Sequence, residues 1–320
     1  MGAGVSAGGP LLDRRRFVAA AAGAVGAAAL GALAPAAAGA GAPAAAPRAF
    51  RLRYAPHFGS FRAHAGDDLV AQLEFARAEG FTAWEDNGMR DRPAADQTRV
   101  ARAMERLGMQ MGVIVGHTID WNVPTLASGD PQGRERFLRE IRESAEVAKR
   151  VNGRWLVVVP GVADRRRDPE YQMVDVIDAL RRAVAVLEPQ GLGVLLEPLN
   201  TRRDHPGQLL SRIPQLHLVV RAVNSPACKL LFDCYHEQIN EGNLLPTLDA
   251  VWPEVAYVQT GDTPGRLEPG TGEVNYRNVF KHLHGKGYRG IVGMEHGTSK
   301  PGREGERALI DAYVAADAWT

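Results

Sequence analysis

The sequence predicts a (β/α)₈ barrel, a single α/β domain in which eight parallel strands alternate with eight helices. Short apolar runs alternate with longer amphipathic runs from Arg51 to the end of the chain, and eight such pairs can be counted. Residues 47–320 have the length of this fold, for which about 250 residues is typical. An open doubly wound sheet is the alternative, but no glycine-rich phosphate-binding motif stands at a strand–helix turn.

The expected strands are short apolar runs, several of which end in a charged or polar side chain. They are Leu52–His57, Thr82–Asp86, Met109–His117, Arg154–Gly161, Gly193–Glu197, Lys229–Asp233, Val255–Gln259 and Gly290–Glu295. Pro198 ends the fifth strand, because proline cannot donate to a sheet ladder.

The expected helices show amphipathic spacing, and glycines close several of them. They are Asp67–Glu79, Ala94–Leu107, Gln132–Val151, Pro169–Leu187, Gln215–Val223, Leu244–Trp252, Tyr276–Lys286 and Arg303–Ala318. The loop that holds Trp121 and runs to Pro131 is unusually long, and long loops in compact domains are often functional.

Residues 1–46 differ in composition from the rest of the chain. Three arginines, Arg14 to Arg16, precede Phe17 and an Ala/Gly-rich apolar run that ends in small residues. This order is typical of an export signal, and the paired arginines resemble a twin-arginine signal. We therefore expect the twin-arginine export machinery as a partner, cleavage of the segment, and an exported barrel without stable membrane insertion. Retention as an uncleaved membrane anchor is the alternative.

The charge balance disfavours nucleic acid as a partner. The formal net charge is +1, and residues 1–46 contribute three arginines and one aspartate, so the barrel carries about −1. Nucleic-acid binding relies on an excess of basic side chains, which is lacking here. The sequence leaves the oligomeric state open, a homo-oligomer included.

Most of the predicted strands end in polar side chains. The carboxyl ends of barrel strands gather the active site, so these residues are the candidates for chemistry. They are His57, Glu85, Asp86, His117, Glu197, Asp233, His236, Gln259, Asp262 and Glu295. Any single acid among them could simply cap its strand or form a salt bridge.

Strands five to eight contribute one oxygen donor each, from Glu197, Asp233, Gln259 and Glu295. Buried carboxylates are costly unless they are paired or bind a metal. Three carboxylates and an amide oxygen suit Mn²⁺ or Mg²⁺ better than zinc, which prefers histidine and cysteine. The four strand ends together predict a divalent metal site.

Several strings of the second half carry a family resemblance. LLEPLN, FDCYH, VQTGDTPGRLEPGTGEVNY and GMEHG are similar to the xylose-isomerase-like TIM barrels and, among these, to the hydroxypyruvate isomerase family. EPGTGEVNY, Glu268–Tyr276, is the most specific string. The resemblance covers residues 50–320, although its specific motifs lie in the second half.

The resemblance implies roles for individual residues. The family's metal ligands fall on Glu197, Asp233, Gln259 and Glu295, and glutamine as third ligand is typical of the hydroxypyruvate isomerase branch. His236 and Arg266 fall where the family binds substrate. His57, His117 and Glu85 are further candidates for the pocket wall, although each histidine could simply be packed at a strand end and Glu85 could orient the metal ligands or cap its strand. Arg266 could instead pair with Glu268 or Asp262.

The resemblance implies an isomerase that interconverts hydroxypyruvate and tartronate semialdehyde through an enediolate. Glu197 and Glu295 would be the paired acid–base groups beside the metal. An exported keto-sugar isomerase or epimerase that uses the same site is the first alternative. A non-catalytic barrel that binds metal or carbohydrate is the second, but it would not need two proton-transfer groups.

Overall fold

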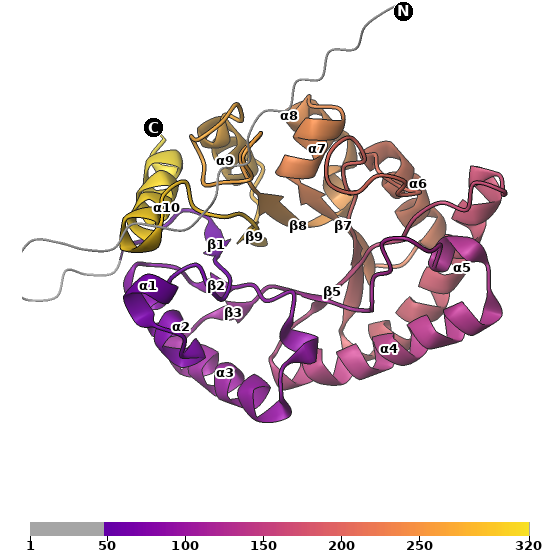
Figure 1. The fold of residues 1–320 in the computed structure, drawn as a ribbon, viewed down its shortest axis with the longest axis horizontal. Helices are drawn as coiled ribbons and strands as arrows, with labels where there is room; N and C mark the ends of the chain where they lie inside the picture. Colours follow the sequence, from indigo (N-terminus) through magenta and orange to yellow (C-terminus); the bar gives the residue numbers. More distant parts are fainter. Residues whose placement is uncertain (1–47, 320) are drawn as a thin grey trace, which may run out of the picture. The chain divides into compact units, whose positions relative to one another are not determined.

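The computed structural model describes residues 48–319, and the nine strands found there are all parallel to their neighbours (Figure 1). Their bounds are β1 Arg53–Ala55, β2 Ala83–Trp84, β3 Gln110–Met111, β4 Val113–Val115, β5 Trp155–Val158, β6 Gly193–Leu196, β7 Cys228–Asp233, β8 Val255–Thr260 and β9 Ile291–Met294. One sheet has the order β1-β9-β8-β7-β6-β5-β4, and β2 pairs with β3. The predicted parallel (β/α)₈ barrel is confirmed.

Short contacts join the two sheets into a closed barrel. β1 pairs with β9, so the first and last strands meet, and His57 and Glu85 form a parallel bridge just beyond β1 and β2. β3 and β4 are two pieces of the single predicted strand 109–117, which is interrupted at Gly112. A Cβ atom at Gly112 would lie 2.5 Å from the Tyr257 hydroxyl oxygen, so this position requires glycine.

The helices lie outside the strands and follow the predicted alternation (Figure 1). Their bounds are α1 Arg62–Ala65, α2 Leu69–Ala78, α3 Ala94–Leu107, α4 Pro131–Arg150, α5 Pro169–Leu187, α6 Ile213–Val223, α7 Cys234–Asn240, α8 Leu244–Val251, α9 Tyr276–Gly285 and α10 Gly302–Asp317. Short 3₁₀ turns occupy Met89–Asp91, Leu126–Ser128, Glu188–Gln190 and Trp252–Glu254. The eight predicted helices are found within two residues of their expected bounds, whereas α1 and α7 were not predicted.

Helix α7 begins directly where β7 ends. Asp233 is the last residue of β7 and the N-cap of α7, and its Oδ1 accepts a hydrogen bond of 2.7 Å from the Tyr235 main-chain N–H. The helix has only two turns and no loop before it. Because Asp233 is both the end of the strand and the N-cap, the sequence shows no separate signal for the start of the helix. It matters because α7 carries His236.

The apolar residues form two layers. The larger one packs the helices onto the outside of the strands. The smaller one fills the barrel, and all eight strand positions contribute to it: Ala55, Ala83, Val113, Val157, Leu195, Leu231, Tyr257 and Ile291. This interior layer is a packed core, as expected for an eight-stranded barrel, and it forms the floor on which the polar strand ends stand.

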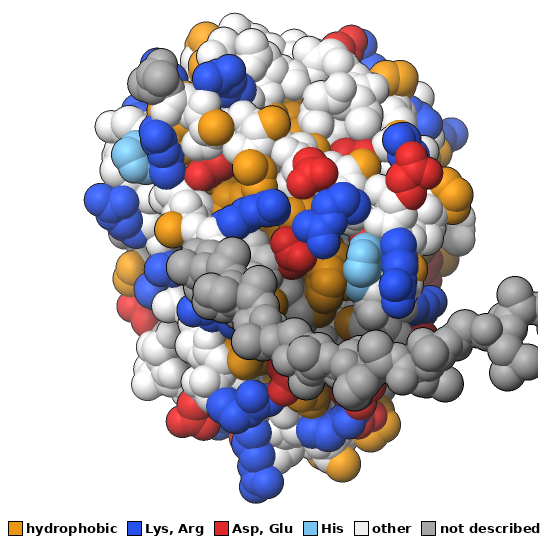
Figure 2. All heavy atoms as spheres, turned by 90° about the vertical axis from the view of Figure 1, so that its left-hand side faces the viewer, with side chains coloured by type: hydrophobic (Ala, Val, Ile, Leu, Met, Phe, Trp, Pro, Cys, Tyr) orange, Lys and Arg blue, Asp and Glu red, His pale blue; other side chains and the backbone are white. Residues whose placement is uncertain are grey.

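The predicted export signal, residues 1–46, lies outside the described part of the chain. Within residues 48–319, no helix is both long and apolar enough to cross a membrane. On the face drawn in Figure 2, lysine and arginine side chains are interspersed with acidic ones.

Candidate functional site

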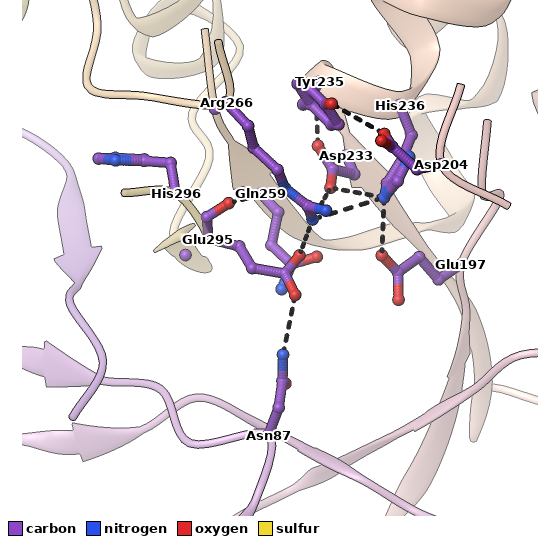
Figure 3. Close-up of polar contacts among 12 residues, drawn as sticks. Asn87, Glu197, Asp204, Asp233, Tyr235, His236, Gln259, Arg266, Glu295 and His296 are labelled. Carbon is purple, nitrogen blue, oxygen red and sulfur yellow. Dashed lines mark hydrogen bonds and ion pairs between the residues drawn. The ribbon is translucent and has the colours of Figure 1, made fainter. Parts of the chain in front are cut away.

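The strand period of two places the polar residues over the interior core. Side chains two positions apart along a strand point to the same side, so Glu197, Asp233 and Gln259 follow the interior residues of β6, β7 and β8 into the barrel. Glu85 stands in the same relation to β2. Glu295 comes one residue after β9. Figure 3 shows that Glu197, Asp233, Gln259 and Glu295 surround one space together with His236 and Arg266.

Glu197, Asp233 and His236 form the buried centre of this group. Their exposed fractions are 8%, 1% and 1%, and one ligand-type atom from each lies within 4.8 Å of the others. His236 Nε2 is 4.0 Å from Glu197 Oε1 and 3.8 Å from Asp233 Oδ2. Three side chains from β7, α7 and the end of β6 thus bring ligand-type atoms together in one buried cluster.

The hydrogen bonds of His236 fix which ring nitrogen carries the proton. Its Nδ1 accepts the main-chain N–H of Asn200 at 3.1 Å. Burial lowers the pKa of His236 to about 4, so the ring is neutral near pH 7 and its proton stays on Nε2. A protonated Nε2 cannot bind a metal. Its neighbours are Arg266 Nη2 at 3.5 Å and the two acids at 3.8 and 4.0 Å. This tautomer favours a ligand set without His236.

Gln259 offers a free oxygen to the same space. Gln259 Nε2 donates to Glu85 Oε1 at 2.9 Å, so the other end of the Gln259 amide, its Oε1, points away from Glu85. Gln259 Oε1 is buried and has no hydrogen-bond partner among the described residues. Tyr257 donates its hydroxyl to Glu85 Oε2 at 2.7 Å. A buried acceptor without a partner is costly unless a ligand fills its coordination.

Glu295 lies across the space from Glu197 and is partly exposed, with 28% of its side chain accessible. Arg266 Nη2 donates to Glu295 Oε2 at 2.9 Å, and Asn87 Nδ2 donates to Glu295 Oε1 at 3.0 Å. Arg266 therefore pairs with Glu295, and neither the Glu268 nor the Asp262 carboxylate takes that place.

The loop after β8 holds Arg266 in position. Asp262 is fully buried and accepts main-chain N–H bonds from Gly270, Gly272 and Val274 at 2.9–3.0 Å. Arg266 has the left-handed φ of +53°, and its guanidinium lies 4.7 Å from the Tyr235 ring centroid. The EPGTGEVNY string thus builds the loop that aims the arginine into the site.

Burial and mutual repulsion disfavour the ionised acids. Burial, then Glu295 and Asp233, raises the pKa of Glu197 well above its ordinary value. Burial also raises the pKa of Glu295, although Arg266 opposes this. Burial, then Glu295, raises the pKa of Glu85 to about 8. A bound cation would reverse this balance for the acids that it contacts.

The remaining predicted pocket residues lie around this centre. His57 Nε2 is 3.3 Å from the His296 main-chain oxygen. His117 accepts the Val159 N–H at 3.3 Å and is buried at the end of β4. Glu85 accepts a hydrogen bond from Gln259 Nε2. Burial lowers the pKa of His117 to about 4, so this ring is a neutral part of the wall.

Sequence reasoning missed several supporting residues. Asn87 positions Glu295, Tyr257 supports Glu85, and Tyr235 bonds Asp204 Oδ2 at 2.8 Å. Only Tyr257 had a signal in the sequence, because it lies two residues before Gln259 on the same face of β8. Asn200 supports the same region, because its Nδ2 donates to Asp204 Oδ2 at 2.7 Å.

The residues present fit a divalent cation. Three carboxylates and a partnerless amide oxygen converge, and oxygen donors of this kind suit Mn²⁺ or Mg²⁺. Arg266 Nη2 lies 3.9 Å from Asp233 Oδ2 and 2.9 Å from Glu295 Oε2, and the His236 ring is neutral. One guanidinium thus faces three carboxyl groups.

A parallel barrel with acids at the carboxyl ends of its strands is the architecture of a barrel enzyme. The model of the Xylose isomerase-like TIM barrel family matches residues 73–314, and the chain belongs to this family.

Named relatives narrow the class. A human protein named provisionally as a hydroxypyruvate isomerase is 31% identical over 235 residues, covering 71% of this chain and 83% of the relative. A 2-oxo-tetronate isomerase of Cupriavidus necator is 35% identical over 139 residues, covering 43% and 52%. A solved structure described as an AP endonuclease, family 2, from Brucella melitensis has a TM-score of 0.69 at 26% identity, covering 79% of this chain and 96% of that chain. Together, the relatives and the family assign the chain to the isomerases.

Proposed function

We propose that this isomerase interconverts hydroxypyruvate and tartronate semialdehyde with the help of a divalent cation. The observation that carries the proposal is the pair of carboxylates, Glu197 and Glu295, on opposite sides of one space that Arg266 and His236 also enter (Figure 3). A proton must leave one carbon and return to its neighbour, which a pair of acid–base groups can perform.

The two glutamates carry the proton transfer. One carboxylate removes a proton from C3 of hydroxypyruvate, which yields an enediolate across C2 and C3. The proton of the C3 hydroxyl moves to the C2 oxygen, and a proton returned to C2 then leaves an aldehyde at C3 and completes 2-hydroxy-3-oxopropanoate, the same atoms rearranged. Because Asn87 and Arg266 bond both oxygens of Glu295, its carboxylate has a fixed direction for this exchange.

Arg266 and His236 bind the substrate. Arg266 Nη2 donates to the Glu295 carboxylate and Nε to the Glu295 main-chain oxygen, which leaves Nη1 and the second N–H of Nη2 to donate to a substrate carboxylate. His236 presents its Nε2–H to a substrate oxygen, with the tautomer set by Asn200. Glu197, Asp233, Gln259 and Glu295 would hold Mn²⁺ or Mg²⁺. When bound, the cation supplies Lewis acidity that polarises the carbonyl and stabilises the enediolate oxygen.

Solvent exchange tests the reaction. Protein loaded with Mn²⁺ and given hydroxypyruvate in D₂O should produce tartronate semialdehyde with deuterium at C2, as read by mass spectrometry. Glu295→Gln should lose product and deuterium together, by about 10²–10⁴-fold, whereas the exposed Glu143→Gln should behave as the parent. Equal turnover in Glu295→Gln, or product without deuterium at every time point, would reject the mechanism.

A larger hydroxy-carbonyl substrate is the second candidate. A relative is named for 2-oxo-tetronate, a four-carbon acid that offers the same carboxylate and neighbouring oxygens to Arg266. An exported keto-sugar isomerase or epimerase would use the same acid–base pair. A panel of hydroxypyruvate, 2-oxo-tetronate and keto-sugars, compared by kcat/KM, separates these candidates.

We also propose that residues 1–46 direct twin-arginine export. The support is the order of three arginines, an apolar run and small residues. Fusion of this segment to a reporter, with Arg14, Arg15 and Arg16 replaced by lysine as control, tests it. A reporter that stays in the cytoplasm with the native segment would contradict export.

A further inference from the structure

The opposite end of the barrel from the acids holds a cavity of about 450 Å³. It opens where the strands begin, and its wall comes from residues at the starts of β1, β3, β5, β8 and β9. They include Arg53, Met111, Arg154, Trp155, Tyr257 and Arg289. A cavity of this volume can enclose a small organic molecule. We call it the basal cavity.

The rim of the basal cavity is basic. Arg53, Arg154 and Arg289 all line it, and none of the three forms an ion pair with a carboxylate within residues 48–319. Arg53 Nη1 donates to the neutral Gln110 side chain at 2.7 Å, and the Arg154 guanidinium lies 4.8 Å from the Trp155 ring centroid. The only carboxylate in the wall is that of Glu105.

The charge is local, because the barrel as a whole carries about −1. A second hollow shares Arg154 and Arg289 with the basal cavity and adds Lys229 and Lys286. These two lysines are already paired with Glu254 and Asp249, at 2.6 Å each. The three arginines are therefore the groups available to an anion, and guanidinium forks match carboxylate and phosphate groups.

The floor of the basal cavity is apolar. Met111, Tyr257 and Ile291 are buried and line it, and the Trp155 ring forms one side. An apolar floor below an arginine rim suits a ligand with an anionic head and an apolar body, since burial of the body adds to the charge contact.

Tyr257 connects the basal cavity to the acidic site. Tyr257 is one of the residues that line the cavity, and its hydroxyl donates to Glu85 Oε2 at 2.7 Å. Glu85 Oε1 in turn holds Gln259 Nε2 at 2.9 Å. Two hydrogen bonds thus link Tyr257, in the cavity wall, to the Gln259 amide in the acidic site.

We propose that the basal cavity binds a small organic anion, a carboxylate or phosphate monoester with an apolar body, and that Tyr257 transmits its presence to Gln259. Residues at the amino-terminal end of the barrel would then regulate a site at the other end. The proposal extends beyond the isomerase reaction and does not depend on its substrate.

Calorimetric titration of the full chain in Mg²⁺ buffer tests binding. Phenyl phosphate and phenylacetate are the probes for the two kinds of anion, and benzyl alcohol is the uncharged control. Arg154→Ala combined with Arg289→Ala should weaken binding of the better anion at least tenfold, because both side chains are exposed and their loss leaves the fold intact. Arg142→Ala, an exposed arginine of α4, is the charge-matched control. Undetectable binding of both anions, equal binding by the double variant, or equally tight benzyl alcohol would overturn the site.

The side-chain amide resonance of Gln259 tests transmission. The better-binding anion should shift this ¹H–¹⁵N signal in the parent and leave it unmoved in the double arginine variant. Tyr257→Phe removes the hydroxyl, so it should bind the anion but lose most of the shift. If the parent signal does not move at saturation, or moves equally in Tyr257→Phe, transmission through Tyr257 is wrong. Neither readout uses hydroxypyruvate, so failure of the proposed reaction would leave this test intact.

Discussion

Glu85 and Gln259, 174 residues apart, are joined by a hydrogen bond of 2.9 Å that decides which end of the Gln259 amide enters the site. Because the nitrogen is held by Glu85, the oxygen is turned into the acidic site and has no partner among the described residues. Glu85 also accepts the Tyr257 hydroxyl, so it receives two donors at once. The carboxylate thus sets the orientation of a residue that we assign as a metal ligand.

Glu85→Gln should weaken Mn²⁺ binding by about 10- to 100-fold, the usual range for a partner that orients a metal ligand. An amide offers one acceptor oxygen where the carboxylate offers two, so Tyr257 and the Gln259 nitrogen can no longer each donate to an oxygen of their own. Calorimetry with Mn²⁺ measures the change, and the exposed Glu143→Gln is the control. Unchanged affinity would mean that Gln259 needs no such support.

The alternation of strands and helices was predictable because each element carries its own periodicity. The apolar runs and the glycines that end the helices are local features of the sequence. The strand period of two then places the side chains of Glu197, Asp233 and Gln259 over the barrel core. The interruption at Gly112 was not predictable in this way, since it depends on the hydroxyl of Tyr257 from a distant strand.

The hydrogen bonds that orient the site residues could not be predicted from local sequence patterns. The bond from Asn87 to Glu295 spans 208 residues, and the bond from Asn200 to His236 spans 36. No periodicity encodes which nitrogen of His236 carries the proton, because that depends on a main-chain N–H from another loop. The sequence predicts the acidic residues of the site but not the groups that orient them.

The losses of kcat caused by Glu197→Gln and by Glu295→Gln should not be additive. If the two carboxylates pass one proton between neighbouring carbons, either change alone stops the exchange, and the double variant should lose about as much kcat as the more damaged single variant. Single-turnover kinetics on hydroxypyruvate with Mn²⁺ provide the three values. A double variant whose loss is the product of the single losses would show that the glutamates act independently.

Arg266→Lys should raise KM for hydroxypyruvate by about tenfold or more and also lower kcat. Lysine keeps the charge but lacks the planar fork that can hold Glu295 and a substrate carboxylate together. Arg202→Lys, at an exposed position of the neighbouring loop, is the matched control. Unchanged KM with a reduced kcat would restrict Arg266 to orienting Glu295.

Acid should destabilise the fold through buried histidines. Burial lowers the pKa of His117 and of His296 to about 4, against about 6.5 in the unfolded chain. Between these values the two rings bind more protons in the unfolded state, so their contribution to the free energy of unfolding falls as pH drops from about 6.5 to 4, by up to about 1.4 kcal/mol per pH unit for each ring.

Urea unfolding at several pH values measures this slope. His117→Gln should flatten it, whereas the exposed His284→Gln is the control. Glu85 acts in the opposite direction, because its pKa of about 8 favours the native state at lower pH. A His117→Gln variant with the same pH slope as the parent between pH 6.5 and 4 would contradict a neutral, buried His117 ring.

Mn²⁺ should stabilise the parent, and Glu197→Gln should remove most of that gain. At one hundred times the Kd, binding adds about 2.7 kcal/mol, which corresponds to a rise in Tm of roughly 5–10 °C for a domain of this size. Without the ion, burial and the charges of Glu295 and Asp233 disfavour an ionised Glu197.

The neutral variant should therefore melt at or above the Tm of the metal-free parent at pH 8, and yet gain little from Mn²⁺. This combination of an unchanged or higher Tm without metal and a small Tm gain with Mn²⁺ identifies a metal ligand. Loss of a structural acid would instead lower the Tm both with and without Mn²⁺. Calorimetric scans with EDTA and with Mn²⁺ provide the four temperatures, and Glu143→Gln should follow the parent in both. An undiminished Mn²⁺ shift in Glu197→Gln would remove Glu197 from the ligand set.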